Sequence, residues 1–477
     1  MAGSGLAAVV LAAGRGTRFR SERPKVLHAA AGRSLLAHVT LAVATLETER
    51  IVVVVGHGAE EVQRELDGLA ERLGRPIEAV VQSEQRGTGD ALHVALEHLG
   101  EGAPERLLVV PGDTPLVTAP TLARLVEHGD GADLVLLSTV LDDPVGYGRV
   151  LREGDRVVGI VEHRDATEAE RAVTEVNAGM YVGRTGLVRD ALTAVDDRND
   201  QGERYLTDVV GHLAAGGATV AAVRAPADEV AGVNDRAQLA AAAAVLRARH
   251  LDHLMREVGV SVVDPAATYV DVDVAVGVDA VLLPGTILER GTTVGARATI
   301  GPDAHLAACT VGEDAVVHST RATEAVIGAG AEVGPFAHLR PGTRLGAGAR
   351  VGAFVQTKNA DIGEGAKVPH LAYLGDAEVG AGANVACGVV TANYDGHDKH
   401  RTVIGEGAFV GCDVVLVAPV TVGPGAFVAA GSTLTHDVPE DALAVARSRQ
   451  LVREGWAARR RALWAQRGAT SGADPHG

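Results

Sequence analysis

A histidine breaks the regular texture of the segment KVPHLAYLGD, in which His370 and Tyr373 stand three residues apart. Aromatic residues make up only 3% of the chain, so a tyrosine beside an imidazole is unusual in a region of Gly, Ala and small aliphatic residues. An imidazole, with an ordinary pKa of about 6.5, can accept a proton from a reacting group at neutral pH. His370 is therefore a candidate general base; the alternative is a surface histidine at a turn.

Two cationic side chains precede this segment, Arg340 in LRPG and Lys358 in FVQTKN, and each lies beside an aliphatic residue of a repeat. Guanidinium and ammonium groups are well suited to binding phosphate. The segment NYDG adds Asn393 and Tyr394. This combination predicts that an anionic substrate binds next to His370.

A second group of polar residues follows the first apolar run, in LAAGRGTRFRSERPKVL. Gly14 and Gly16 would let the backbone approach a ligand closely, and N–H groups in such a turn can bind phosphate. The spacing matches neither a P-loop nor the dinucleotide fingerprint, so the glycines alone would favour an ordinary α/β turn. The cations Arg15, Arg18 and Lys25 favour an anion-binding site instead.

Acidic and amide side chains follow later apolar runs. Asp113 in VVPGDTPL could be either a ligand of a divalent metal or a helix N-cap, and the amide oxygen of Asn234 in GVNDR could join it on the metal. The segment VQSEQRGTGDA offers amides for the edge of a base. Glu162 in GIVEHRDA and Asn177 in TEVNAGM are suited to sugar hydroxyls.

The first group of motifs lies on an alternating pattern of strands and helices over residues 1–235. Apolar runs such as LAAVVLAA, RIVVVVGH, IEAVVQ, RLLVVPGD and DLVLLSTV predict a largely parallel, Rossmann-like sheet covered on both faces. Ligands of such sheets bind at the carboxyl ends of the strands. Residues 236–258 predict a helix that acts as a rigid linker; the alternative is an ordinary final helix of this α/β domain.

A different pattern covers residues 259–447. An aliphatic residue followed by Gly recurs at spacings close to multiples of six, and the register holds through five consecutive hexads from Ile404 to Leu434. A hexapeptide period predicts a parallel β-helix, which in such coils winds left-handed. Residues 448–477 form a basic C-terminal tail with a helical patch, and we expect its last ten residues to be disordered.

Composition narrows the class of protein. The 477 residues carry a formal net charge of −17, which argues against nucleic acid and anionic membranes as main partners. No apolar stretch approaches the roughly 18 residues of a membrane span, and the apolar start of the chain lacks the basic region of a signal peptide. Three scattered cysteines predict neither disulfides nor a zinc site, which is typical of the cytoplasm.

The motifs together resemble the sugar nucleotidyltransferases. Those that carry the resemblance are LAAGRGTR with PKVL, QSEQRGTG, PGDTPL, DDPVGYGR, GIVEHRDAT, EVNAGM and GVNDR. With the hexapeptide repeat, about residues 6 to 457 resemble the bifunctional family that fuses an N-acetylglucosamine-1-phosphate uridylyltransferase to a glucosamine-1-phosphate N-acetyltransferase. The resemblance implies acetylation of glucosamine-1-phosphate by acetyl-CoA in the C-terminal domain. Uridylyl transfer from UTP to N-acetylglucosamine-1-phosphate would follow in the N-terminal domain, releasing pyrophosphate and giving UDP-N-acetylglucosamine for the cell wall.

The resemblance also implies roles in uridylyl transfer. It assigns nucleotide contacts to Gly14, Lys25, Gln82, Gly87 and Thr88. It assigns sugar contacts to Gly148, Glu162 and Asn177. It assigns Mg²⁺ to Asp113 and Asn234, and Lys25 and Arg18 would align the phosphates with the metal.

For acetyl transfer, the resemblance implies that His370 is the general base. It assigns the sugar phosphate to Arg340, Lys358, Tyr373 and Asn384. It assigns acetyl-CoA to Asn393, Tyr394, Ala430 and Arg447, with Cys387 and Cys412 beside the CoA channel. In this family the site lies between neighbouring β-helices of a homotrimer.

The sequence departs from the family pattern in this half. Gln356 stands where many members have Glu, and Cys412 stands where Ser is usual near the thioester carbonyl. Ala386 and Cys387 replace a more Gly-rich stretch. A thiol is a weaker donor than a hydroxyl and is bulkier, so we expect weakened or altered CoA binding.

Two other functions are compatible with parts of the pattern. One is a single-function sugar-nucleotide pyrophosphorylase with a structural or regulatory β-helix, which would not need His370 and Lys358. The other is a metal-dependent hydratase or a trimerisation scaffold, with His370, His397 and His400 as ligands, although their spacing fits no zinc motif.

Overall fold

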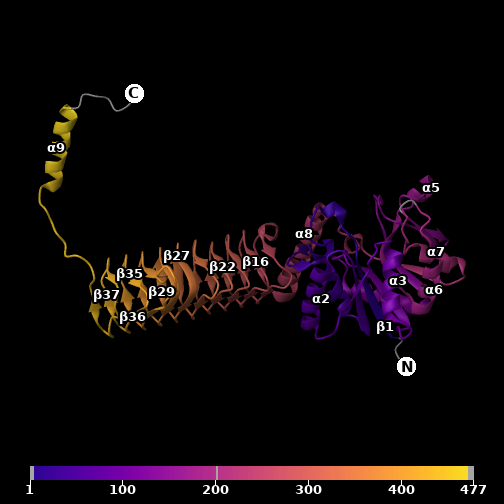
Figure 1. Ribbon diagram of the computed structural model, residues 1–477, viewed down its shortest axis with the longest axis horizontal. Coiled ribbons are helices and arrows are strands. Elements are labelled where there is room, and N and C mark those ends of the chain that lie inside the picture. The colour runs from indigo at the N-terminus through magenta and orange to yellow at the C-terminus, as the bar shows by residue number, and fades with distance from the viewer. Residues whose placement is uncertain (1–4, 200–201, 471–477) are drawn as a thin grey trace. The chain divides into compact units, whose positions relative to one another are not determined.

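A computed structural model describes residues 5–199 and 202–470 of the chain (Figure 1). The chain divides into two compact units, Met1–Thr292 and Thr293–Gly477. The first coils of the repeat therefore group with the α/β unit, and the domain boundaries expected from the sequence remain predictions.

The first unit is built on a mixed sheet. Its main path runs β11 (Val220–Arg224), β7 (Leu134–Val140), β10 (Glu175–Arg184), β6 (Arg106–Pro111), β1 (Leu6–Ala12), β4 (Arg50–Val55) and β5 (Glu78–Val81). All five apolar runs form strands, as predicted. The sheet is parallel except at β10, which is antiparallel to both β6 and β7, and at the hairpin of β8 (Arg149–Glu153) and β9 (Arg156–Val161). The sequence pattern did not reveal this antiparallel part.

Helices cover both faces of the sheet (Figure 1). One buried core includes residues of α1 (Leu35–Ala44), α2 (Ala59–Leu73) and α4 (Ala119–His128). The other includes residues of α3 (Thr88–Leu99), α6 (Thr185–Ala194) and α7 (Asp208–Ala215). The short helix α5 spans Glu168–Arg171. Burial on both faces explains why the central strands are continuously apolar rather than alternating.

The predicted linker helix is α8 (Arg236–His253), and one π-helical turn continues it over Leu254–Val258. Asp235 caps it by accepting a hydrogen bond from the backbone N–H of Gln238. Ala242 of the helix belongs to a small core with Phe19, Leu35 and Leu116. The helix links the two regions of the sequence, and its inner face packs on the α/β core.

The second unit is a parallel β-helix of short strands. The strands that position residues discussed below are β25 (His338–Leu339), β27 (Arg350–Ala353), β28 (Gln356–Ile362), β29 (Lys367–His370), β30 (Tyr373–Val379), β31 (Asn384–Val385), β32 (Val390–Ala392), β34 (Phe409–Val410) and β37 (Phe427–Val428). Each pairs in parallel with the strand of the next coil. The predicted hexad aliphatics from Val294 to Leu434 are all buried, which confirms the repeat.

The basic tail contains α9 (Trp456–Thr470), as its helical pattern predicts. Disorder was expected over the last ten residues, 468–477, but α9 includes the first three of them, up to Thr470. The rest of that expectation, 471–477, lies outside the described residues.

Candidate functional site

A cavity of about 650 Å³ opens at the carboxyl ends of β1, β5 and β6, where a doubly covered sheet is expected to bind ligands. Eleven residues were predicted for uridylyl transfer. Eight of them line this cavity: Gly14, Lys25, Gln82, Gly87, Thr88, Asp113, Glu162 and Asn177. The other three lie beside the lining: Gly148 and Asn234 form hydrogen bonds with its residues, and Arg18 forms one with Asn234. The sheet thus brings together residues from Gly14 to Asn234.

A charged cluster lies at one side of the cavity. Lys25 Nζ forms an ion pair with Asp113 and donates to Asn234 Oδ1 at 3.3 Å. Arg18 Nη2 donates to the same amide oxygen at 3.2 Å. The carbonyl oxygen of Asp113 accepts from the N–H of Val233, which brings Asn234 to the cluster. The side-chain oxygens of Asp113 and Asn234 therefore meet two cations at a place where a phosphate chain could bind.

The alternative role of Asp113 as a helix N-cap is wrong. The helix that follows it, α4, is capped by Thr118, whose hydroxyl accepts from the N–H of Thr121. The carboxylate of Asp113 is therefore available to Lys25 and to a ligand.

Glu162 and Asn177 face the cavity from the antiparallel part of the sheet. Burial raises the pKa of Glu162, as do Asp208 and Asp165, while a hydrogen bond from Thr207 at 3.1 Å opposes this effect. The β10 register shifts between Asn177 and Tyr181, and such a bulge redirects a side chain. Asn177 Nδ2 donates to Tyr181 Oη at 2.6 Å.

Gly148 lies next to Glu162 and Asn177. Its carbonyl oxygen accepts from the N–H of Asn177 at 2.9 Å. A Cβ at this position would lie 2.9 Å from Ile160 Cγ2 and 3.4 Å from Glu162 Oε1. The absence of a side chain here leaves room for Glu162 in its present position.

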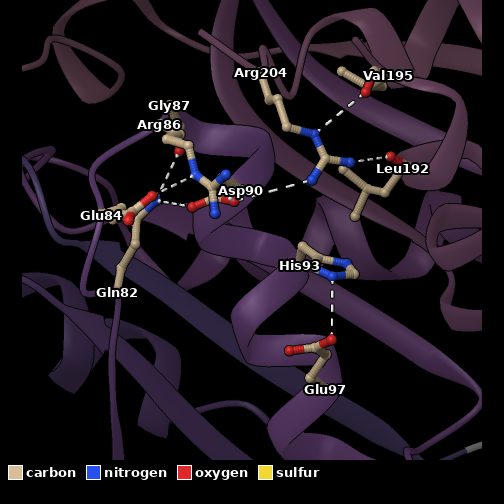
Figure 2. A network of polar contacts seen from close by, with 10 residues as sticks. All are labelled: Gln82, Glu84, Arg86, Gly87, Asp90, His93, Glu97, Leu192, Val195 and Arg204. Atoms are coloured by element: carbon tan, nitrogen blue, oxygen red, sulfur yellow. Dashed lines mark hydrogen bonds and ion pairs between the residues drawn. The ribbon is translucent and has the colours of Figure 1, made fainter. Parts of the chain in front are cut away.

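Gln82 belongs to a buried polar network (Figure 2). Its Nε2 donates to the carbonyl oxygen of Gly87 at 3.2 Å and to Asp90 Oδ2 at 2.9 Å. Asp90 also lies 4.0 Å from Arg204 Nη1 and 3.9 Å from Arg86 Nε. Sequence reasoning missed Asp90 and Arg204. An acid in the first helical turn after QRGTG was the available signal, but such acids are common as partners of the helix dipole.

Cations also gather in the second unit. Arg340 N donates to the carbonyl oxygen of Thr357, and Lys358 pairs with Gly375 on the next coil. The pKa of Lys358 is lowered, first by the close approach of the Lys399 ammonium and then by the charge of Arg340. Because these positive charges repel one another, we expect a bound anion to stabilise the cluster. Lys399 was missed because its loop position in GHDKH gives no sign of the neighbours.

Asp376 is the counter-charge in this cluster. Asn359 and Asn393 each donate to it at 2.6 Å. Burial raises its pKa, but these two bonds and the charges of Lys399 and Lys358 outweigh that effect and lower it. The predicted residue Asn393 is thus held by Asp376.

His370 is exposed and ends β29, where its strand position pairs with Ala353 of the preceding coil. Tyr373 begins the next strand and pairs with Gln356. Within residues 5–199 and 202–470, the imidazole of His370 has no hydrogen-bond partner. His370 and Tyr373 stand at the two ends of one corner of the coil.

The residues assigned to acetyl-CoA follow one another up successive coils. The carbonyl oxygen of Cys387 accepts from the N–H of Asp413, and that of Cys412 accepts from the N–H of Gly431. A Cβ on Gly431, next to Ala430, would lie 3.6 Å from Arg447 Cδ. Tyr394 is exposed and donates to the carbonyl oxygen of Gly396. Asn384, which is assigned to the sugar phosphate, pairs with Phe409.

The hydratase interpretation finds no support. His397 contacts Asp398, and His400 contacts Asp395. Over the described part of the chain, no three His, Cys, Asp or Glu side chains are grouped as metal ligands would be.

The cysteines of the described part of the chain are free. None of the helices described has the length and apolarity needed to cross a membrane.

Comparison with known proteins bears on both units. The family model of the MobA-like NTP transferase domain matches residues 8–177, and that of the bacterial transferase hexapeptide matches residues 401–436. The chain is 50% identical to a "Bifunctional protein GlmU" of Mycolicibacterium gilvum, over 96% of this chain and 93% of that protein. Proteins of the same name match at 49% in Streptomyces avermitilis, over 95% and 94%, and at 48% in an Exiguobacterium species, over 95% and 99%.

Proposed function

The chain belongs to the bifunctional GlmU family, and from that premise we propose how its two sites divide the synthesis of UDP-N-acetylglucosamine. The protein is a transferase with a uridylyltransferase and an acetyltransferase activity. The single-function alternative is not favoured, because the similarity extends over both regions of the chain. The residue roles, the domain limits 1–235, 236–258 and 259–447, the metal, the trimer and the cytoplasmic location are the proposed parts.

The cavity of the first unit carries out uridylyl transfer. The phosphate oxygen of N-acetylglucosamine-1-phosphate attacks the α-phosphorus of UTP, and the bond to the β-phosphate breaks to release pyrophosphate. The nucleophile is already an anion, so the reaction needs alignment and charge neutralisation rather than a base. Lys25 and Arg18 supply positive charge at one side, and Glu162 and Asn177 accept and donate hydrogen bonds to the sugar.

The oxygen atoms of Asp113 and Asn234 fit Mg²⁺. Both reach Lys25 Nζ, so they already converge on one cation. Magnesium is commonly held by one or two protein oxygens together with substrate phosphates and water, which matches this pair. When bound, the metal would neutralise charge on the phosphates.

The β-helix acetylates glucosamine-1-phosphate. His370 removes a proton from the amine, whose nitrogen then attacks the thioester carbonyl of acetyl-CoA, and CoA leaves as the thiol. Arg340, Lys358 and Lys399 bind the sugar phosphate. The observation that carries this assignment is the cation cluster, because repulsion among its members is relieved by a bound anion.

A homotrimer and acetyl-CoA binding at Cys387, Cys412, Ala430 and Arg447 complete the proposal. His370 is exposed and unpartnered within the described part of the chain, so a neighbouring subunit could complete its surroundings. Analytical ultracentrifugation should give three times the mass of one chain.

Two separate assays test the division of labour: pyrophosphate release from UTP and thiol release from acetyl-CoA. Lys25→Ala and Asp113→Ala should abolish only the first, and His370→Ala only the second. His436→Ala, at an exposed histidine of the same β-helix, is the matched control and should change neither. Thiol release that persists in His370→Ala would show that another group is the base.

A further inference from the structure

Asp90 is a buried acid close to the nucleotide cavity, and uridylyl transfer assigns it no role. It is 6% exposed and lies in the first turn of α3, while Gln82 is 4% exposed. Burying a charged carboxylate is unfavourable unless partners compensate it. Here an amide hydrogen bond and two guanidinium groups surround it (Figure 2).

The orientation of the Gln82 side-chain amide follows from these contacts. Both groups near one end of the amide, the Asp90 carboxylate and the Gly87 carbonyl, can only accept hydrogen bonds. The atom that faces them must therefore be the nitrogen. Both Nε2 hydrogens are used, and Oε1 remains an acceptor.

That oxygen is an unused acceptor on a residue of the cavity lining. Gln82 lines the cavity, and nothing in the described part of the chain donates to Oε1. Some polar side-chain atoms of the described residues are buried and have no hydrogen-bond partner. Gln82 Oε1 is not one of them. The site therefore offers a fixed acceptor, rather than an adaptable amide, to a base.

We propose that Asp90 is a positioning residue that determines which base the cavity accepts. By fixing the Gln82 amide, it selects a base that presents an N–H donor, as uracil does at N3. Cytosine presents an acceptor at N3, which would face the Gln82 oxygen unpaired. This inference rests on the proposed uridylyl transfer and adds the residue that sets its base specificity.

Arg204 holds Asp90 in place from the other side. Its Nη2 donates to the carbonyl oxygen of Leu192 at 2.6 Å and its Nε to that of Val195 at 3.3 Å, which ties it to the end of α6 (Figure 2). The N–H of Arg204 donates to the carbonyl oxygen of Arg86, and its carbonyl oxygen accepts from the N–H of Gly89. The segment that carries Arg204 is therefore fastened to the loop that carries Asp90.

The test measures kcat/KM of the full chain with UTP and with CTP, using N-acetylglucosamine-1-phosphate as the second substrate. Asp90→Ala removes the acceptor and frees the Gln82 amide to turn, so the UTP/CTP ratio should fall at least about tenfold, in line with the loss of one well-placed hydrogen bond. Asp90→Asn can still present an oxygen to Nε2 and should keep the ratio within about threefold of the unchanged chain.

A double-mutant cycle separates positioning from general damage to the fold. In a Gln82→Met background, Asp90→Ala should leave the ratio unchanged, because no amide remains to be oriented. The inference is overturned if Asp90→Ala keeps the parental ratio, if Asp90→Asn loses it as fully, or if the effect persists without Gln82. If the unchanged chain releases pyrophosphate from neither nucleotide, the proposed function fails instead.

Discussion

Gly87→Ala is the change whose effect on the nucleotide site can be worked out most directly. Gly87 has φ 106° and ψ 178°, a region that residues with a side chain essentially avoid, at a cost of about 1–3 kcal/mol. Its Cβ would lie 2.6 Å from the carbonyl oxygen and 3.0 Å from the nitrogen of Arg204. Both are backbone atoms, so no side-chain rotation can relieve the contact.

The neighbouring segment must therefore move. Two backbone hydrogen bonds join it to the Gly87 loop, Arg204 N–H to Arg86 and Gly89 N–H to Arg204, and each contributes about 1 kcal/mol. The native loop geometry should lose about 3–5 kcal/mol in all. Even about 3 kcal/mol corresponds to roughly a 150-fold loss in the fraction of correctly formed sites.

The assay is kcat/KM for UTP in pyrophosphate release, with acetyl transfer by the same protein as the internal reference. Gly68→Ala is the matched control, because Gly68 lies on the exposed face of α2 with no atom within 4 Å of its Cβ position. That control should be neutral or slightly stabilising. If Gly87→Ala matched Gly68→Ala within about threefold, the steric reasoning would be refuted.

Three further outcomes follow from the same structure. Thr207→Val removes a hydrogen bond that favours the ionised form of Glu162, so the pKa of Glu162 should rise further. The acid limb of the pH profile of uridylyl transfer should then move to higher pH. An unmoved limb would exclude Glu162 as the titrating group. Arg50 holds the pKa of Glu78 at about 2 by hydrogen bonding, below its ordinary 4.5. That stabilisation is complete above pH about 4.5 and is lost as pH falls towards 2, so Arg50→Met should lower the melting temperature of the first unit at pH 7 and much less near pH 3, and equal losses at both pH values would count against it. Cys412→Ser should lower the KM for acetyl-CoA if the thiol weakens CoA binding; equal KM and kcat in the two proteins would contradict this.

The repeat illustrates what local pattern can determine. The hexad aliphatics are buried in the core of the β-helix, and their spacing specifies the strands and their burial without long-range information. The five strands of the first unit could also be predicted from their apolar runs, because strands buried on both faces must be apolar throughout. Motifs placed after those runs then located Lys25, Asp113 and Gln82 at one end of the sheet.

Tertiary structure decided which of these residues touch, and what else surrounds them. Asn234 reaches Lys25 through a backbone bond between Val233 and Asp113, groups that are far apart in the sequence. Asp90, Arg204 and Lys399 gain their significance from neighbours on other elements, and no spacing in the chain encodes those contacts. The sequence by itself determined the elements and the chemical types they carry, because periodicity and turn residues act locally. Only the folded chain determined orientation, burial and charge coupling, because these arise from side chains that different elements bring within a few ångströms of one another.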